Sequence, residues 1–246
     1  MISLLDQEKL ATELKTGTGK GVRVALLDTG VQESHEDLRD TVAASYELIQ
    51  TGRGFVCKKT TGTDTVGHGS ACASIIKRIA PEAELHSLKV FGSNSRLGAD
   101  ALAFAIRWCN ENKIQVVNAS LGTVDPRSQK VLSEAADQAY YDGMTIVAAA
   151  NNSGLTAYPA NLSSVLAVNS QSFKDPLKFN YLLNTPIELE SNGIYVEAPN
   201  PQGGHKLYTG TSFACPHISG IVARLLSIYP GLRPFEIRTL LWHIGR

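Results

Sequence analysis

The segment from Gly210 to His217 carries the first group that could do chemistry, the hydroxyl of Ser212. A glycine-led turn delivers this serine, and an apolar run over residues 218–228 follows at once. Such a turn can present a hydroxyl at the mouth of a helix, where backbone N–H groups point outward and the dipole is positive. A serine there can act as a nucleophile if a base and an orienting acid lie within reach. The alternative interpretation is an ordinary helix N-cap.

A histidine and an aspartate upstream are candidates for the base and the acid. His68 lies between two glycines at the start of a predicted helix, and Asp28 closes the apolar run of residues 22–27. An imidazole, with an ordinary pKa near ~6.5, can accept the serine proton and later return it to a leaving amine. A carboxylate can hold that imidazole in the correct tautomer and stabilise its charged form. Alone, each residue also fits a turn or a cap.

The alternation of helical and strand patterns indicates how these groups are positioned. Apolar runs that end in a polar residue are typical of buried parallel strands, whose carboxyl ends face a ligand crevice. We predict a doubly wound α/β fold, with a mostly parallel sheet of about seven strands flanked by helices. The expected strands cover residues 22–27, 43–49, 84–90, 115–119, 145–150, 165–169 and 193–198. The expected helices cover residues 3–14, 68–79, 98–112, 127–142, 211–229 and 234–244.

Composition narrows the class of protein. The chain has 246 residues, of which 43% are hydrophobic and 19% charged, as in a globular protein with a substantial core. Lysine plus arginine balances aspartate plus glutamate at 23 each, so charge suggests neither nucleic acid nor membrane as a partner. The four cysteines lack C-x-x-C spacing, which favours free thiols in a reducing compartment over a zinc site or disulfides. Without repeats or linkers, residues 1–246 are predicted to form one domain.

With its three motifs in this order, the sequence resembles the subtilisin-like serine proteases, the subtilases, over nearly its whole length. The motifs are Val24-Ala25-Leu26-Leu27-Asp28-Thr29-Gly30, Gly67-His68-Gly69-Ser70 and Gly210-Thr211-Ser212-Phe213-Ala214-Cys215-Pro216-His217. The order of acid, base and nucleophile along the chain is the subtilisin order. The resemblance implies that Asp28, His68 and Ser212 form a catalytic triad. It also implies that the side-chain amide of Asn152 and the backbone N–H of Ser212 bind the oxyanion, with Asn151 a weaker candidate.

The resemblance further implies that a peptide substrate binds as an added strand between two edges, residues 93–98 and 120–123. The first edge contains Ser95, Arg96 and Leu97, and Arg96 could favour an acidic residue or could simply be a solvated surface residue. The pocket for the residue before the scissile bond is expected to be uncharged. Its walls and floor would come from Ser120, Leu121, Gly122, Ala149, Ala150 and Ala157.

Four departures from the family pattern bear on these expectations. Ser70-Ala71 stands where the family has threonine and a second histidine, outside the triad. The helix after His68 lacks the calcium-binding insertion of many secreted relatives, and we expect no metal and no cofactor. Residues 173–190 lack a signature that usually precedes the late strand. Only 27 residues precede Asp28, so we expect a mature catalytic domain without signal peptide or prodomain.

These observations favour a serine endopeptidase that works through an acyl-enzyme. We expect a cytoplasmic processing protease that is restrained either by narrow specificity or by a regulatory partner. Two alternatives remain open. A macrocyclase or ligase would pass the acyl group to an amine, but it needs a lid against water and no insertion is large enough. A catalytically silent peptide-binding module would have the same scaffold, but all four expected catalytic positions are filled.

Overall fold

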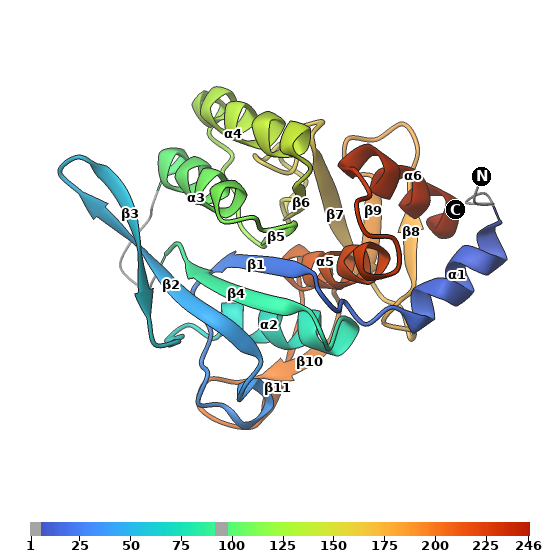
Figure 1. Ribbon diagram of the computed structural model, residues 1–246, viewed down its shortest axis with the longest axis horizontal. Coiled ribbons are helices and arrows are strands. Elements are labelled where there is room, and N and C mark those ends of the chain that lie inside the picture. Colours follow the sequence, from blue (N-terminus) through green and yellow to red (C-terminus); the bar gives the residue numbers. More distant parts are fainter. Residues whose placement is uncertain (1–5, 92–97) are drawn as a thin grey trace.

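The computed structural model describes residues 6–91 and 98–246 (Figure 1). Within this part, nine strands form one sheet in the order β3-β2-β4-β1-β5-β6-β7-β9-β8, and two more form a separate small sheet. The strands of the large sheet are β1 Arg23–Asp28, β2 Val42–Thr51, β3 Gly54–Thr60, β4 Glu84–Lys89, β5 Val116–Ala119, β6 Thr145–Ala149, β7 Val165–Gln171, β8 Phe179–Tyr181 and β9 Leu189–Asn192. The small sheet pairs β10 Val196–Pro199 with β11 His205–Tyr208.

Every pairing from β2 across to β9 is parallel, and only the outermost strands β3 and β8 run antiparallel. The sequence explains the parallel centre, because β1, β5 and β6 are almost continuously apolar and buried. Such strands need cover on both faces. The doubly wound, mostly parallel fold predicted from the sequence is therefore confirmed, with nine strands in place of about seven.

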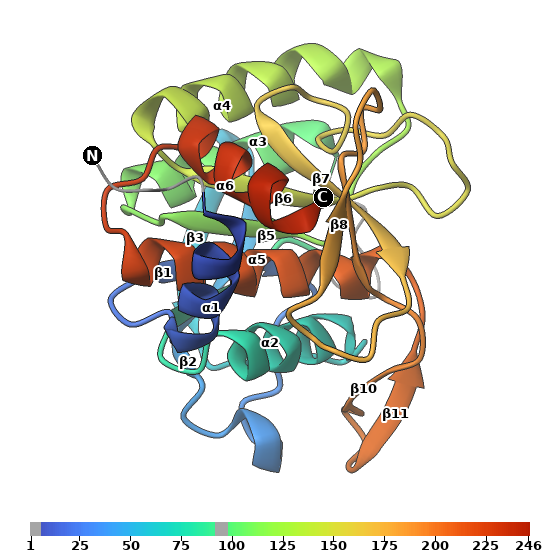
Figure 2. The same cartoon turned by 90° about the vertical axis from the view of Figure 1, so that its right-hand side faces the viewer.

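Helices supply that cover on both faces of the sheet (Figure 2). They are α1 Gln7–Thr16, α2 His68–Ile79, α3 Ala99–Glu111, α4 Gln129–Asp142, α5 Thr211–Ile228 and α6 Pro234–Gly245. One core packs α2 and α5 against alternate β1 side chains such as Val24 and Leu26. The other packs α3 and α4 against the intervening Ala25 and Leu27. No helix in the described residues is long and apolar enough to cross a membrane.

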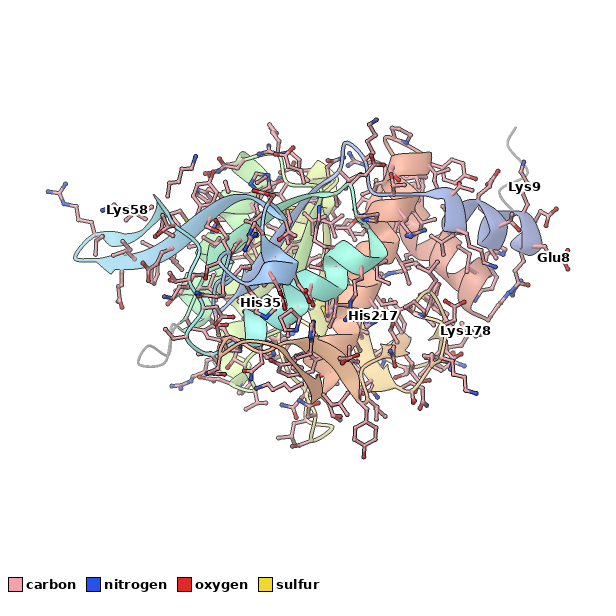
Figure 3. The ribbon with its side chains drawn as sticks, turned by 90° about the horizontal axis from the view of Figure 1, so that it is seen from below. Glu8, Lys9, His35, Lys58, Lys178 and His217 are labelled. Atoms are coloured by element: carbon pink, nitrogen blue, oxygen red, sulfur yellow. The ribbon has the colours of Figure 1, made fainter. Side chains whose placement is uncertain are left out.

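The differences from the predicted elements lie in short or exposed strands. The strand expected over residues 193–198 is β10, which belongs to the small sheet. The prediction missed β3, which lies at a sheet edge with mostly exposed side chains and so lacks a buried apolar run. It also missed β8, β9 and β11, which have only three or four residues each. Of these, β8 lies within the atypical segment and β9 crosses its end. The β2–β3 hairpin projects from the body and carries Lys58 (Figure 3).

Candidate active site

Asp28, His68 and Ser212 come from three elements that meet at the carboxyl ends of the central strands. Asp28 is the last residue of β1, His68 is the first of α2, and Ser212 is the second of α5. Because β1 lies at the middle of the sheet, between β4 and β5, its carboxyl end opens where the strand order reverses. This is the usual position of a ligand crevice in an open α/β sheet.

Asp28 and His68 are in direct contact. Oδ1 of Asp28 lies 2.7 Å from Nδ1 of His68 and also accepts the backbone N–H of Thr29 at 2.8 Å. A carboxylate oxygen only accepts, so Nδ1 carries the imidazole proton and Nε2 is left free to act as a base. The Asp28 side chain is 1% exposed and that of His68 is 25% exposed. The acid is thus sealed in the protein and the imidazole reaches the crevice.

Two opposing effects act on the pKa of His68. Burial disfavours the charged imidazolium and lowers the pKa, whereas the charge of Asp28 and its hydrogen bond raise it. The contact with the carboxylate is short and shielded from water, so we conclude that the pKa of His68 lies above its ordinary value.

The Ser212 hydroxyl hydrogen bonds to the backbone carbonyl of Ser120, at 3.2 Å. Neighbouring contacts nevertheless hold Ser212 and His68 in one cluster. The ring of Phe213 lies 5.2 Å from that of His68, centroid to centroid. The Cys72 sulfur lies 4.0 Å from Nδ1 of His68 and 3.3 Å from the carbonyl oxygen of Ser212. Hydrogen bonds between catalytic groups are often long without substrate and tighten only when substrate is bound.

A proline inside α5 explains how the backbone of Ser212 is held. Pro216 lies four residues after Ser212 and has no N–H, so the Ser212 carbonyl lacks its helical donor. The hydroxyl of Ser120 donates to that carbonyl at 2.9 Å, and the Cys72 thiol adds the 3.3 Å contact. Asn118 in turn donates to the Ser120 hydroxyl at 2.9 Å. The end of β5 thereby anchors the turn that carries the hydroxyl.

Asn152 lies beside the start of α5. Its Oδ1 accepts the backbone N–H of Thr211 at 3.0 Å, and the Thr211 hydroxyl donates to the Ala150 carbonyl at 2.6 Å. Nδ2 of Asn152 makes no hydrogen bond to any described residue, and the side chain is exposed. Because Oδ1 is held by Thr211, the amide NH₂ beside Ser212 is available to a ligand. Asn151 instead accepts the N–H of Ser153 at 2.8 Å.

The expected substrate-binding residues fall into two groups. Ser95, Arg96 and Leu97 lie outside the described residues. The other expected pocket residues are Ser120, Leu121 and Gly122 after β5, Ala149 and Ala150 at the end of β6, and Ala157 on the following loop. Ala149, Ala150 and Ala157 are each at most 9% exposed.

The wall after β5 and the loop that carries Ala157 are joined by a backbone bridge. Thr123 donates to the Tyr158 carbonyl at 2.9 Å and accepts from the Tyr158 N–H at 2.8 Å. A side chain at Gly122 would press on that same carbonyl oxygen, with its Cβ at 2.9 Å, so the wall requires glycine there. The bridge brings the expected wall and floor of the pocket together.

Sequence reasoning missed two residues close to the triad. Asp64 is buried and hydrogen bonds to the start of α2, and Thr211 orients Asn152. Thr211 was recognised as part of a motif but given no role. An aspartate shortly before a predicted helix is a capping signal, and it could have drawn attention to Asp64.

Asp28, His68 and Cys72 are the one set of three possible metal ligands found in the described residues, with ligand atoms within 4.8 Å of one another. Two of the three are the acid and base of the expected triad, and the Asp28–His68 hydrogen bond already accounts for their closeness. Burial raises the pKa of the Cys72 thiol, which disfavours the thiolate that binds metals.

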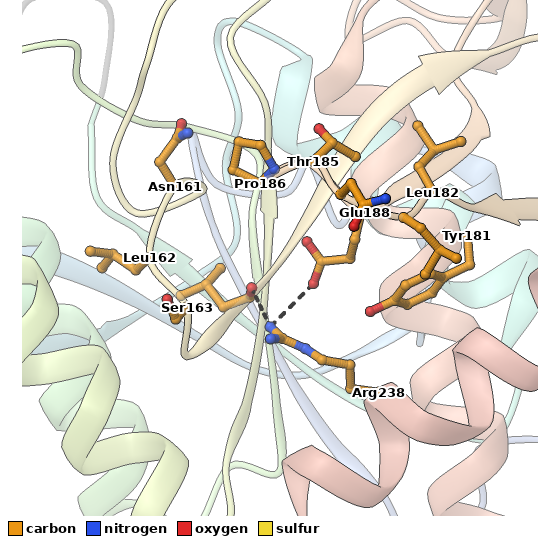
Figure 4. Close-up of a pocket in the computed structure, with 12 residues that line it drawn as sticks. Asn161, Leu162, Ser163, Tyr181, Leu182, Thr185, Pro186, Glu188 and Arg238 are labelled. Carbon is orange, nitrogen blue, oxygen red and sulfur yellow. Dashed lines mark hydrogen bonds and ion pairs between the residues drawn. The ribbon is translucent and has the colours of Figure 1, made fainter.

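A separate cavity of about 290 Å³ opens where β7 begins, and none of the expected site residues lines it (Figure 4). Glu188 and Arg238 meet there, with Arg238 Nη2 3.1 Å from the carboxylate and 2.8 Å from the Val165 carbonyl. The Arg238 guanidinium is therefore already bonded to Glu188 and to the Val165 carbonyl within the protein. The triad crevice, and not this cavity, holds the reactive groups.

Comparison with known proteins identifies the family. Residues 19–244 match the model of the subtilase family, Peptidase S8. Subtilisin DY of Bacillus licheniformis is 32% identical over 239 residues, covering 91% of this chain and 83% of that protein. Subtilisin BL of Lederbergia lenta is 30% identical over 232 residues, covering 90% and 82%.

Solved structures agree with this. The S41 psychrophilic protease superposes with a TM-score of 0.77 at 28% identity, covering 92% of this chain and 83% of that one. Sphericase gives the same TM-score, identity and coverage. The family match extends over the strands and helices that carry Asp28, His68 and Ser212. The chain therefore belongs to the subtilase family and is a subtilisin-like serine endopeptidase.

Proposed function

We propose that Ser212 attacks the carbonyl of a peptide bond while His68 takes its proton through Nε2. Asp28 holds the imidazole and stabilises its charge, and His68 then gives the proton to the leaving amine. Water, activated by His68 in the same way, hydrolyses the acyl-enzyme. The observation that carries this proposal is the 2.7 Å contact of Asp28 with Nδ1 of His68, beside the nucleophile turn of α5.

The oxyanion of the tetrahedral intermediate would be bound by two donors, Nδ2 of Asn152 and the backbone N–H of Ser212. The bond from Thr211 to Oδ1 of Asn152 supports this assignment, because it leaves Nδ2 as the free end of the amide. The position of Ser212 in the first turn of α5 supports it too, since the first N–H groups of a helix have no partner within the helix. Fixed donors of this kind need no reorganisation during the reaction.

We further propose that the substrate lies in extended form along residues 120–122, with residues 93–98 as the opposite edge. Ser120, Leu121 and Gly122 form no backbone–backbone hydrogen bonds with other described residues, although the Ser120 carbonyl accepts from the Ser212 hydroxyl. The other backbone groups can therefore pair with an added strand. The expected pocket carries alanine, glycine, serine and leucine side chains and no charge. A substrate with an uncharged residue before the scissile bond therefore fits it best.

The finer role that we propose is selective processing of a peptide or protein precursor in the cytoplasm, under the control of a regulatory partner. All four cysteines are unpaired in the structure, and free thiols persist in reducing compartments. Unrestrained proteolysis there would damage the cell, which favours narrow specificity. Rapid and broad digestion of unfolded casein by the isolated protein would contradict this role.

Labelling with a fluorophosphonate probe, followed by peptide mass mapping, tests the proposed chemistry. We expect modification at Ser212 in the wild type and none in Ser212→Ala, with strongly reduced labelling in His68→Ala. Labelling elsewhere, or no labelling of a folded wild type, would contradict the assignment of the nucleophile. The same preparation can be incubated with a peptide library. Cleavage after lysine, arginine, aspartate or glutamate in preference to uncharged residues would contradict the proposed pocket.

A further inference from the structure

A second buried carboxylate lies next to the triad and has no part in the proposed proton transfers. Asp64 stands four residues before His68 and is 2% exposed. Among the described residues, no lysine, arginine or histidine forms an ion pair with it. A buried carboxylate without a cation is costly unless hydrogen bonds satisfy it, so its partners must account for its presence.

Hydrogen bonds to both carboxylate oxygens supply that compensation. Oδ1 of Asp64 accepts the Thr29 hydroxyl at 2.9 Å and the backbone N–H groups of Gly67 and Val66 at 2.8 and 3.1 Å. Oδ2 accepts the backbone N–H and the hydroxyl of Ser70 at 2.9 and 2.7 Å. All five donors lie next to the ends of β1 and α2.

These bonds replace a missing helix cap. The residue that precedes α2 is Gly67, which has a left-handed conformation and no side chain to accept from the first turn. The N–H groups of that turn lack partners within the helix. Asp64 accepts from Ser70, and the Thr29 hydroxyl accepts the N–H of Gly69 at 3.0 Å. The start of α2, and with it His68, is therefore held from outside the helix.

Thr29 connects this cap to the catalytic acid. Its N–H donates to Oδ1 of Asp28, and its hydroxyl bridges Asp64 and Gly69. Thr29 therefore contacts the catalytic acid Asp28, the capping carboxylate Asp64 and the first turn of α2. The start of α2 is packed tightly against the end of β1, because a side chain at Gly69 would overlap the Gly30 carbonyl oxygen.

We infer that Asp64 and Thr29 are positioning residues, which fix the start of α2 against the end of β1 and so set the hydrogen bond between Asp28 and His68. This inference rests on the proposed function for its catalytic consequence, but the geometry it describes exists without substrate. Ser70 takes part as the donor to Oδ2 of Asp64. Its presence in place of the family's usual threonine keeps the hydroxyl that this bond requires.

The chemistry of the five donors explains why a carboxylate is needed. An ionised aspartate only accepts hydrogen bonds, and here every partner can donate. Asparagine has the same shape, but its NH₂ group would face either the Gly67 and Val66 N–H groups or the Ser70 N–H. Asp64→Asn therefore sets donor against donor on one side of the site, while the volume of the side chain is unchanged.

The test compares Thr29→Val and Asp64→Asn with Thr29→Ser, which keeps the hydroxyl. Leu240→Ala in α6 is the control for lost stability, because Leu240 is buried in the core on a helix that carries no triad residue. Four quantities are measured in the full chain: kcat and KM on a chromogenic peptide, the melting temperature, and the downfield proton resonance of the His68 Nδ1–H. The NMR signal does not depend on turnover.

We expect Thr29→Val and Asp64→Asn to lower kcat/KM about 10–100-fold, almost entirely in kcat, because small misplacements of catalytic groups have costs of this size. The downfield resonance should weaken or broaden. The acidic limb of kcat/KM should move to lower pH, since His68 faces the Asp28 carboxylate and the neutral Cys72 thiol and loses support from Asp28. Thr29→Ser should restore the wild-type behaviour. Leu240→Ala should lower the melting temperature with kcat and the resonance retained.

The positioning role is overturned if Thr29→Val keeps the wild-type kcat and resonance, if Thr29→Ser loses as much as Thr29→Val, or if Leu240→Ala reproduces the loss. If Asp64→Asn fails to fold, the comparison of Thr29→Val with Thr29→Ser tests the positioning role by itself. A different outcome identifies failure of the proposed function. In that case the wild type neither labels at Ser212 nor cleaves peptides, yet its downfield resonance is present and disappears in Thr29→Val.

Discussion

The two neighbouring asparagines, Asn151 and Asn152, show how differently identical side chains can be used. Oδ1 of Asn151 accepts the N–H of Ser153 within its own turn, a local bond that shapes the loop. Oδ1 of Asn152 accepts from Thr211, which belongs to the start of α5. The long-range bond ties the Asn152 amide to the nucleophile turn, which favours the proposed oxyanion role for Asn152 over Asn151.

Replacing Asn152 with alanine should reduce kcat about 10²–10³-fold with little change in KM. The lost donor acts on charge that develops only in the transition state. Steady-state kinetics on a peptide substrate measures the effect. Asn151→Ala is the matched control and should stay within about threefold of the wild type. Equal losses in the two variants would show that the loop as a whole, and not one amide, is responsible.

The acidic limb of the pH profile should lie above the ordinary histidine value of ~6.5. His68 must be neutral to accept the proton, and the Asp28 carboxylate raises its pKa. Activity is therefore lost as pH falls through that raised value. The pH dependence of kcat/KM measures it. An acidic limb below the ordinary histidine value in the wild type would contradict the assignment of His68 as the base paired with Asp28.

Asp28→Asn should lower kcat about 10⁴-fold, because the imidazole is then no longer held in the correct tautomer.

At the scale of elements, helices bring the reactive groups to the ends of the strands, and glycines allow the approach. The start of α2 lies so close to β1 that Gly69 has no room for a side chain beside the Gly30 carbonyl. At the other end of the crevice, Pro216 leaves the Ser212 carbonyl open to Ser120. Both helices are thus anchored by groups outside themselves.

Gly69→Ala should destabilise the fold by about 1–3 kcal/mol, because the neighbour that must move is backbone. It should also reduce activity, since His68 moves with α2. Chemical unfolding and peptide hydrolysis measure the two effects. Gly52→Ala is the control, as a Cβ at Gly52 meets no atom within 4 Å and its conformation is not left-handed. If Gly69→Ala is as stable as Gly52→Ala, the start of α2 can move away from β1 without cost, and the prediction is wrong.

At the scale of the whole molecule, α6 packs beside the late strand β8, and an ion pair connects it to the segment before β9. Arg238 of α6 contacts Glu188, just before β9, and the Val165 carbonyl at the start of β7. The Glu188 side chain is only 10% exposed. Burial raises the pKa of this carboxyl, and the charge of Arg238 opposes that increase. The ion pair thus ties together elements that are distant in sequence.

Arg238→Met should destabilise the protein by about 3 kcal/mol at neutral pH, because it leaves a buried carboxylate without its cation. The double variant Arg238→Met/Glu188→Leu should recover most of that loss. A carboxyl whose pKa is raised on folding contributes stability that is lost as pH rises through the folded-state pKa. The deficit of Arg238→Met should therefore shrink as pH falls toward the ordinary glutamate range. A deficit independent of pH would point to lost packing.

The sequence by itself determined the class of fold and the identity of the reactive groups. Runs such as residues 22–27 are apolar over their whole length, and this property is local to a buried parallel strand. The motifs around Asp28, His68 and Ser212 are local as well, because each turn has to deliver one group at one strand or helix end. Short strands such as β8 escaped prediction, since three residues at a sheet edge carry too little pattern.

Only the tertiary structure decided how those groups are held. Asp64 is an ordinary aspartate until the fold brings Thr29 and Ser70 to its two oxygens. The partner of the Ser212 carbonyl is Ser120, which lies 92 residues away in the chain. Hydrogen bonds across such separations depend on the packing of strands against helices, and residue types alone do not encode them. The chemistry was therefore readable from local motifs, whereas its positioning required the assembled sheet and helices.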